Sequence, residues 1–492
     1  MTRERRIFLG AIVAFFAVFF FISYRCLLQP PFFDEMWKMD VAFSPKNLDL
    51  HDRNTTPIAI GWLFIQTILF TFAGDNVAIA RVETAAWAAA AAGIAGLCYL
   101  EPTKKASYLA MGAAFGVALA LPVQVVVKDY NPYGFDMFYA SVLVAVACLW
   151  NRLSSSRRFV GLCALTATPL FSIGALFFIP CTALALVWQA RRDRWRYAII
   201  LATVSATALT IVVQEVFYKP VMSSSTLTNW WAQFIVNASP NRYVDRVVAL
   251  PRELAQSMQP FLLLPAEPLW LALVALSIIG FACLWRANRF AFLVQIGAIV
   301  TVCVAAFFIP WPLLTTKYMG RMNLAWTWIV YASVGAGLAQ TLSYVRRFVS
   351  IPDRLAVPLL FILLFPLQAP LAVGGVSPFR QLYDDLKTIP LEADGTQIVA
   401  SAHPLSWWYA DFYFTRTRPD TFVVVAEKSD EDFNNAIIRA VREHPKTHDL
   451  WLILPFEALQ AAVDRARALH VPGFSKVSSQ RLQEAEIWRY QR

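Results

Sequence analysis

The chain contains a series of apolar runs, each about 20 residues long, the length at which a helix crosses the hydrocarbon core of a bilayer. Hydrophobic residues make up 58% of the 492 residues and charged residues only 15%, too few charges for the surface of a soluble domain. The first run, 7–28, follows three arginines and lacks a small-residue cleavage site before Pro30 and Pro31. We therefore expect it to remain as a first membrane span rather than to be removed as a signal peptide.

Basic residues gather in the short loops between apolar runs, as they do in cytoplasmic loops of membrane proteins. The formal net charge of +10 therefore reflects membrane topology, and we expect no nucleic-acid partner. With the basic loops inside, the amino terminus is cytoplasmic, the carboxyl terminus is outside, and the chain crosses about eleven times. The predicted spans are 7–28, 79–99, 106–127, 133–150, a hairpin of two spans over 158–190, 197–217, 266–285, 290–310, 323–342 and 355–373.

Two long loops are predicted on the outer side, at about 29–78 and 218–265. The first contains an apolar stretch, 58–72, which the topology requires to re-enter or to lie along the membrane interface.

Residues 1–375 form a predicted transmembrane domain and residues 376–492 a predicted extracytoplasmic α/β domain. In the latter, 396–402, 421–426 and 450–455 are typical of buried strands, and two amphipathic helices alternate with them. That order predicts a small parallel sheet.

Three outer segments combine carboxylates, cations and aromatic side chains. Asp34 and Glu35 follow the first span directly, with His51 and Arg53 further along the loop and Arg81 opening the second span. Adjacent carboxylates at a membrane surface are costly unless they are solvated, paired or functional. A solvated turn explains this pair as well as a functional site does.

The other two segments lie at the outer ends of later spans. Lys128, Asp129, Tyr133 and Asp136 belong to one short turn, and an ionisable group at the entry of a span is a functional candidate, with pairing to Lys128 as the structural alternative. Lys317 and Arg321 lie beside aromatic residues, where they could bind a phosphate group or anchor the chain at the interface. The sequence alone leaves both alternatives open.

These segments resemble the motifs of a known superfamily of membrane proteins. An acidic pair after the first span, then a proline-initiated amphipathic stretch ending at an arginine, resembles the GT-C superfamily, and more closely the family of protein O-mannosyltransferases and lipid A aminoarabinose transferases. The segment Asp129–Asp136 resembles the Glu-Leu-Lys-Pro-Tyr-Ala-Leu-Asp turn of that family, with Asp instead of Glu at 129 and Asn instead of Lys at 131. Further similar motifs are Pro169–Ser172, Leu227 with Trp230 and Trp231, and Gly320 with Arg321. The resemblance covers about residues 5–345 and rests on the order of these motifs on one predicted face.

The resemblance implies an inverting glycosyltransferase of the bacterial cytoplasmic membrane. It would move a hexosyl or pentosyl group from a polyprenyl-phosphate donor to an extracytoplasmic glycolipid, cell-wall polysaccharide or protein. A carboxylate would act as general base on the acceptor hydroxyl. The implied roles are Asp34 as base; Glu35, Asp129 and Asp136 as orienting carboxylates; Arg81, Lys128, Lys317 and Arg321 around the donor phosphate; and His51, Arg53, Tyr133, Trp230 and Trp231 on substrate. The acidic pair would suit a divalent cation, although the sequence requires no cofactor.

Two other classes remain as alternatives. A transporter or lipid flippase would have more charges within spans, and broken spans at matching positions in two halves. Here the charges cluster at outer span ends, and no internal repeat is visible. A non-catalytic scaffold that presents the C-terminal domain is the second alternative.

Overall fold

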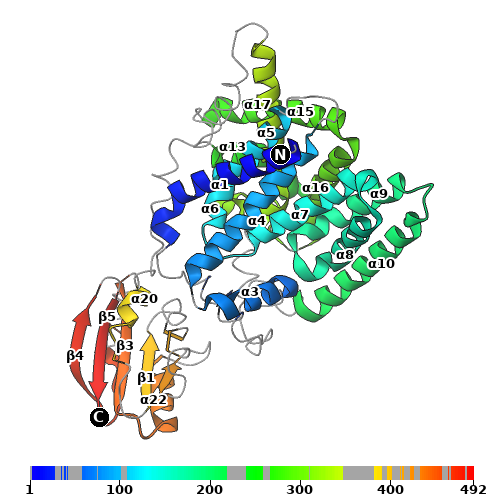
Figure 1. Ribbon diagram of the computed structural model, residues 1–492. Helices are drawn as coiled ribbons and strands as arrows, with labels where there is room; N and C mark the ends of the chain where they lie inside the picture. Colours follow the sequence, from blue (N-terminus) through cyan, green and yellow to red (C-terminus); the bar gives the residue numbers. More distant parts are fainter. Residues whose placement is uncertain are drawn as a thin grey trace. The chain divides into compact units, whose positions relative to one another are not determined.

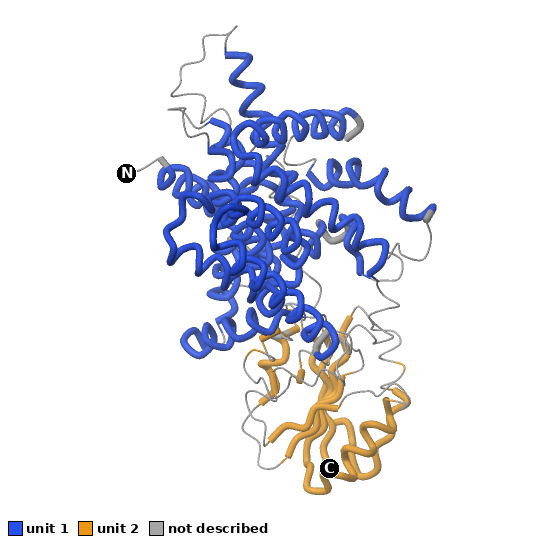
Figure 2. The backbone as a smooth tube through the Cα atoms, turned by 90° about the vertical axis from the view of Figure 1, so that its right-hand side faces the viewer, with its two compact units in different colours: residues 1–27, 48–374 blue, residues 28–47, 375–492 orange. Residues whose placement is uncertain are grey.

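The computed structural model of the chain describes residues 3–27, 35, 38–39, 42, 58–74, 76–100, 108–218, 240–258, 266–309, 311–346, 382–390, 396–401, 410–411, 413–414, 421–425, 433–456, 464, 467–482 and 485–492. The chain forms two compact units (Figure 2). The first consists of Met1–Leu27 and Leu48–Gly374, and the second of Leu28–Asn47 and Gly375–Arg492.

The first unit is helical throughout its described residues (Figure 1). Its elements are α1 (Arg3–Leu27), α3 (Ile60–Ala73), α4 (Val77–Cys98), α5 (Tyr108–Ala118), α6 (Leu121–Val127), α7 (Tyr133–Leu149), η2 (Trp150–Arg152), α8 (Ser155–Phe171), η3 (Gly174–Phe178), α9 (Ile179–Gln189), α10 (Trp195–Val213), η4 (Gln214–Tyr218), α13 (Pro240–Ser257), α15 (Ala266–Ala287), α16 (Arg289–Phe308), η6 (Lys317–Asn323) and α17 (Leu324–Val345).

Six of the described helices are long and apolar enough to cross a membrane, and seven are if the bent pair α5–α6 counts as one span. Helices occupy every predicted span except 355–373, which lies outside the described residues. The predicted hairpin over 158–190 consists of α8, η3 and α9, and the stretch expected at the interface contains the 14-residue helix α3. The count of about eleven spans stays a prediction, because α8, α9 and α17 are not among the six.

The predicted span 106–127 is bent by 47° between α5 and α6. Pro122 lies in the first turn of α6 and has no N–H, so it cannot bond the carbonyl oxygen of Ala118 four residues earlier. The side chain of Gln124 replaces that donor: its Nε2 donates to the Ala118 oxygen over 2.5 Å and to the Phe15 oxygen of α1 over 3.3 Å. A neighbouring side chain thus satisfies the backbone at the break, as an apolar surrounding requires.

Helices α5 and α17 cross at short distance, with glycines from both helices at the contact. Gly112 and Gly116 are four residues apart on α5 and lie against Gly335 of α17, where a Cβ on Gly335 would collide with the Gly112 carbonyl oxygen. This small-residue spacing lets two membrane helices approach each other at backbone distance.

The second unit contains a five-stranded sheet in the order β2-β1-β3-β5-β4. Its strands are β1 (Gln397–Ser401), β2 (Phe422–Val425), β3 (Asp449–Pro455), β4 (Ser475–Arg481) and β5 (Ala485–Gln491), with helices α20 (Leu382–Leu386) and α22 (Phe433–Glu443). Alternate residues of β3, Leu450, Leu452 and Leu454, form one core with Phe433 and Ile437 of α22.

The three predicted strands and their parallel pairing are confirmed, but the sheet as a whole is mixed rather than parallel. Strands β2, β1 and β3 pair in parallel, whereas β5 and β4 add an antiparallel hairpin at one edge. Every residue of β4 is exposed, so the strand has no alternation of buried and exposed residues that its sequence could show.

Candidate active site

The short turn between α6 and α7 holds the first group of predicted site residues. Tyr130 is fully buried and stacks on Trp62 of α3, with ring centroids 5.3 Å apart, while Phe70 of α3 meets it edge-on at 5.4 Å. Lys128, Asp129 and Tyr133 are partly buried. Helix α3 therefore packs directly on the turn that carries these residues.

Asn131 determines the shape of this turn. Its Nδ2 donates to the backbone oxygens of Val126 and Asp129 over 2.7 Å each, and its Oδ1 accepts from the Tyr133 N–H over 3.0 Å. The side chain thereby ties the end of α6 to the first turn of α7. The family that the sequence resembles has a lysine at this position, whereas the side chain of Asn131 forms hydrogen bonds with the backbone.

Asp136 lies in the first turn of α7 and meets the loop after α8. Its Oδ1 accepts a 2.5 Å hydrogen bond from the Ser172 hydroxyl, which in turn accepts from the Ala175 N–H over 3.0 Å. A Cβ on Gly174 would lie 3.4 Å from the Asp136 Cβ and would collide with the Cβ of Ala325 in α17. Asp136 therefore lies where α7, the 172–174 loop and the start of α17 converge.

The predicted Gly-Arg motif lies in η6, just before α17. Gly320 has a φ of +64°, a left-handed conformation that favours glycine, and its N–H bonds the Thr316 oxygen. Asn323 locks the segment through a 2.7 Å bond from its Nδ2 to the Thr315 oxygen. Because η6 packs on α6, the structure brings the partly buried Arg321 to the same region as the Lys128–Asp136 turn.

Three buried polar atoms at the start of α17 have no hydrogen-bond partner among the described residues. They are Oδ1 of Asn323, Nε1 of Trp326 and Oγ1 of Thr327. Unpartnered buried polar atoms are rare in native structures and often mark a site completed by water or a ligand.

Arg81, predicted to contact the donor phosphate, is fully buried in the first turns of α4. Its Nη1 donates to the carbonyl oxygen of Leu27, at the end of α1, over 3.0 Å. This bond ties the start of α4 to the point where the chain leaves the first span.

The remaining predicted site residues are not brought together by the described structure. Glu35 is 1% exposed and belongs to the second compact unit. Asp34, His51, Arg53, Trp230 and Trp231 lie outside the described residues, and so does the side chain of Lys317. Among the described residues, no group of three or more His, Cys, Asp or Glu side chains is arranged to hold a metal ion.

Sequence reasoning missed a carboxylate inside α4. Oε1 of Glu83 accepts a 3.2 Å hydrogen bond from Gln66 Nε2 of α3 and a further hydrogen bond from Nε1 of Trp87. Its Oε2 is buried without a partner among the described residues. Glu83 and Gln66 are 17 residues apart on two different helices, so no sequence spacing marks the pair.

No protein-family model and no curated protein matches the chain. Two crystal structures of ArnT from Cupriavidus metallidurans match 98% of this chain over 98% of their own length. The apo form has a TM-score of 0.52 at 11% identity, and the form bound to undecaprenyl phosphate has a TM-score of 0.53 at 12% identity. The chain thus has the fold of these ArnT structures, and the resemblance inferred from the sequence is confirmed at the level of the fold.

Proposed function

We propose that the protein is an integral membrane glycosyltransferase that transfers a sugar from a polyprenyl-phosphate donor to an extracytoplasmic acceptor. The fold it shares with ArnT over nearly the whole chain carries this proposal, since one of the ArnT structures binds undecaprenyl phosphate. The convergence of Asp136, Ser172 and the η6 segment supports it, because a carboxylate and an arginine lie in one region of the helical unit.

The proposed reaction is an inverting displacement at the anomeric carbon. Asp34 would take the proton from the acceptor hydroxyl, while Glu35, Asp129 and Asp136 orient the acceptor or the base. Arg81, Lys128, Lys317 and Arg321 would stabilise the phosphate leaving group, and His51, Arg53, Tyr133, Trp230 and Trp231 would contact the substrates. The hydrogen bond from Ser172 would hold the Asp136 carboxylate in one orientation.

The proposed enzyme crosses a bacterial cytoplasmic membrane about eleven times, with its amino terminus inside. Residues 1–375 would carry the transfer reaction. Residues 376–492 would lie outside the cytoplasm and recognise an acceptor such as a glycolipid, a cell-wall polysaccharide or a protein.

Donor turnover by the purified protein in nanodiscs tests the proposal. The protein is offered a panel of polyprenyl-phosphate pentoses and hexoses together with candidate acceptors, and release of polyprenyl phosphate is measured. Asp34→Asn should abolish the release, whereas Glu443→Gln, at a side chain 57% exposed in the second unit, should not change it. Turnover that survives in Asp34→Asn would support the transferase activity but exclude Asp34 as its general base.

A transporter or flippase of polyprenyl-phosphate lipids is the alternative function. Fluorescent polyprenyl-phosphate sugar in proteoliposomes distinguishes the two. Movement between leaflets without release of polyprenyl phosphate would favour the flippase, and release without such movement would favour the transferase.

A further inference from the structure

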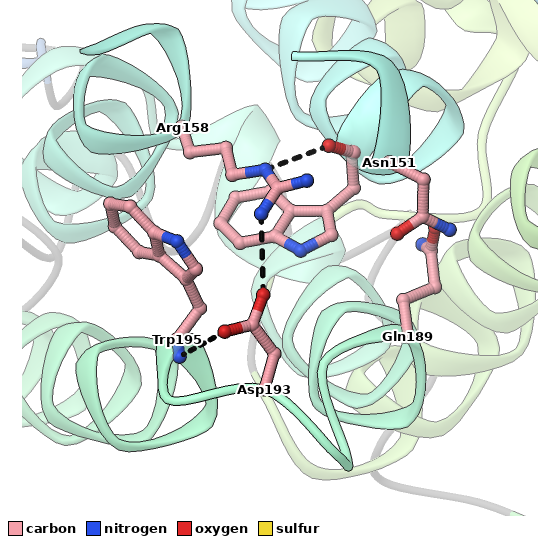
Figure 3. A network of polar contacts seen from close by, with 6 residues as sticks. Asn151, Arg158, Gln189, Asp193 and Trp195 are labelled. Atoms are coloured by element: carbon pink, nitrogen blue, oxygen red, sulfur yellow. Dashed lines mark hydrogen bonds and ion pairs between the residues drawn. The ribbon is translucent and has the colours of Figure 1, made fainter. Parts of the chain in front are cut away.

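One end of the helical unit is held together by a polar network around Arg158 (Figure 3). Arg158 Nε donates to the Trp150 oxygen over 3.1 Å, and its Nη1 pairs with Asp193 Oδ2 at 3.3 Å. The other oxygen of Asp193 accepts from the N–H of Trp195 over 3.4 Å, at the start of α10. The network thus joins the end of α7, the start of α8 and the loop between α9 and α10.

Further hydrogen bonds fix the neighbouring helix ends. Asn151 donates to Gln189 over 3.1 Å, and Gln189 donates to the Ala147 oxygen over 2.8 Å. The N–H of Asp193 bonds the Ala190 oxygen over 2.8 Å, which closes the α9–α10 loop into a tight turn. The side chains of this loop therefore project from an ordered backbone.

The surface of this end is strongly cationic. Residues 137–214 contain seven arginines, no lysine and a single acidic residue, Asp193. Because Asp193 is already paired with Arg158, it does not neutralise the arginines around it. The arginine patch consists of the six that are exposed, Arg152, Arg157, Arg191, Arg192, Arg194 and Arg196.

Exposed aromatic side chains flank the arginine patch. Trp188 is 65% exposed with the Arg191 guanidinium 5.6 Å from its ring, and Tyr197 is 64% exposed with the Arg196 guanidinium 4.5 Å from its ring. Tryptophan and tyrosine prefer the headgroup level of a bilayer. Beyond them, α8, α9 and α10 expose the apolar side chains of Phe159, Val160, Leu184, Ile200, Leu201 and Val204.

We propose that the arginine patch binds the phosphodiester headgroup of an anionic phospholipid, with its acyl chains along the exposed apolar side chains of α8 and α10. A guanidinium matches a phosphate with two parallel hydrogen bonds, which a lysine cannot offer. Clusters of four to eight basic residues next to a membrane helix are a recognised signature of anionic lipid binding.

This binding site is distinct from the proposed donor site. Asp136 and Arg152 lie at opposite ends of the α7–η2 helix and are separated by roughly 24 Å along its axis. The occupant is a bilayer phospholipid and not the polyprenyl-phosphate donor, and its binding does not depend on the proposed enzymatic activity.

Native mass spectrometry of the detergent-purified full chain, titrated with phosphatidylglycerol or phosphatidylcholine, tests the proposal. The test variant is the triple change Arg191→Gln, Arg192→Gln and Arg194→Gln, which leaves the Arg158–Asp193 pair intact. The matched control, Arg442→Gln with Lys446→Gln and Arg481→Gln, removes the same charge from exposed positions in the second unit. A third variant replaces the three arginines of the loop by lysine.

Phosphatidylglycerol should bind the wild type and the matched control at least tenfold more tightly than phosphatidylcholine. The glutamine triple should lose on the order of 10- to 100-fold in phosphatidylglycerol affinity, and the lysine triple should lose less because it keeps the charge. Equal affinity of the wild type for the two lipids, or an unchanged glutamine triple, would overturn the proposal. Displacement by glycerol phosphate or undecaprenyl phosphate at equal concentration would also overturn it, by showing a free-phosphate or carrier-lipid site.

Discussion

At the scale of single residues, Asp136 is the carboxylate whose surroundings are best defined. Its carboxylate accepts a hydrogen bond from Ser172, and its Cβ lies beside Gly174, close to the start of α17. Asp136→Asn keeps an oxygen that can accept the Ser172 hydrogen bond but removes the negative charge. We expect the thermal unfolding midpoint to change little and donor turnover to fall roughly 100-fold, the size of effect that a misplacement of the reacting groups by about 1 Å can have.

The matched variant is Ser172→Ala, which removes the hydrogen bond and keeps the charge. Its turnover should lie between those of the wild type and Asp136→Asn, as measured by release of polyprenyl phosphate. Wild-type turnover in Asp136→Asn would show that Asp136 has only a structural role.

Single residues also show where the sequence stops being informative about the site. A resemblance marked the Asp129–Asp136 turn, and the structure places Tyr130, Asn131 and Asp136 in it. The role of Asn131 in linking α6 to α7 has no sequence signal, because its hydrogen-bond partners are backbone groups. Glu83 was missed for a similar reason, since its donors lie on α3 and one turn further along α4.

At the scale of elements, the break between α5 and α6 predicts that the Gln124 side chain contributes to stability. Gln124→Leu leaves the oxygens of Ala118 and Phe15 without their donor in an apolar surrounding, which should cost about 1–3 kcal/mol of stability. The matched change is Gln295→Leu in α16, because Gln295 is equally buried but neither of its side-chain polar atoms has a partner among the described residues.

Gln295→Leu should be neutral or stabilising, since it removes an unsatisfied buried amide. Both variants are compared with the wild type by thermal unfolding in the same detergent. Equal losses of stability in the two would show that the Gln124 hydrogen bonds contribute nothing beyond the shape of the side chain.

The crossing of α5 and α17 predicts a second difference between two similar changes. Gly335→Ala places a methyl group against the Gly112 carbonyl oxygen and must separate the two helices, a change that should destabilise by about 1–3 kcal/mol. Gly10→Ala meets only the flexible end of Met111 at 3.3 Å and should be tolerated. The measurement is again the unfolding midpoint, and an unaffected Gly335→Ala would contradict the close crossing.

Elements were predictable from the sequence where burial imposes a pattern. Each predicted membrane span within the described residues is helical, because a helix satisfies its own backbone in an apolar surrounding. The bend at α5–α6 was not predicted, although Pro122 marks it, because bending also depends on the hydrogen bond that the Gln124 side chain donates to the Ala118 oxygen. Strand β4 was missed because all its residues are exposed.

At the scale of the whole molecule, the distribution of arginine predicts how the chain is oriented in the membrane. Ser156 is exposed beside the arginine patch, and Ser479 is exposed on β4 of the second unit. If basic loops face the cytoplasm and the C-terminal domain lies outside, these two positions are on opposite sides of the bilayer. A cysteine introduced at each position in turn tests this, in a chain whose exposed Cys163 is replaced by serine.

In spheroplasts, a membrane-impermeant maleimide should label Ser479→Cys at once and Ser156→Cys only after the membrane is permeabilised. The contrast has a physical basis, because arginines near a membrane span resist translocation whereas a mixed-charge α/β domain does not. Labelling of both positions in intact spheroplasts would contradict the predicted topology. The reverse pattern would place the arginine patch outside, together with the phospholipid leaflet that it binds, and would move the proposed acceptor to the cytoplasmic side.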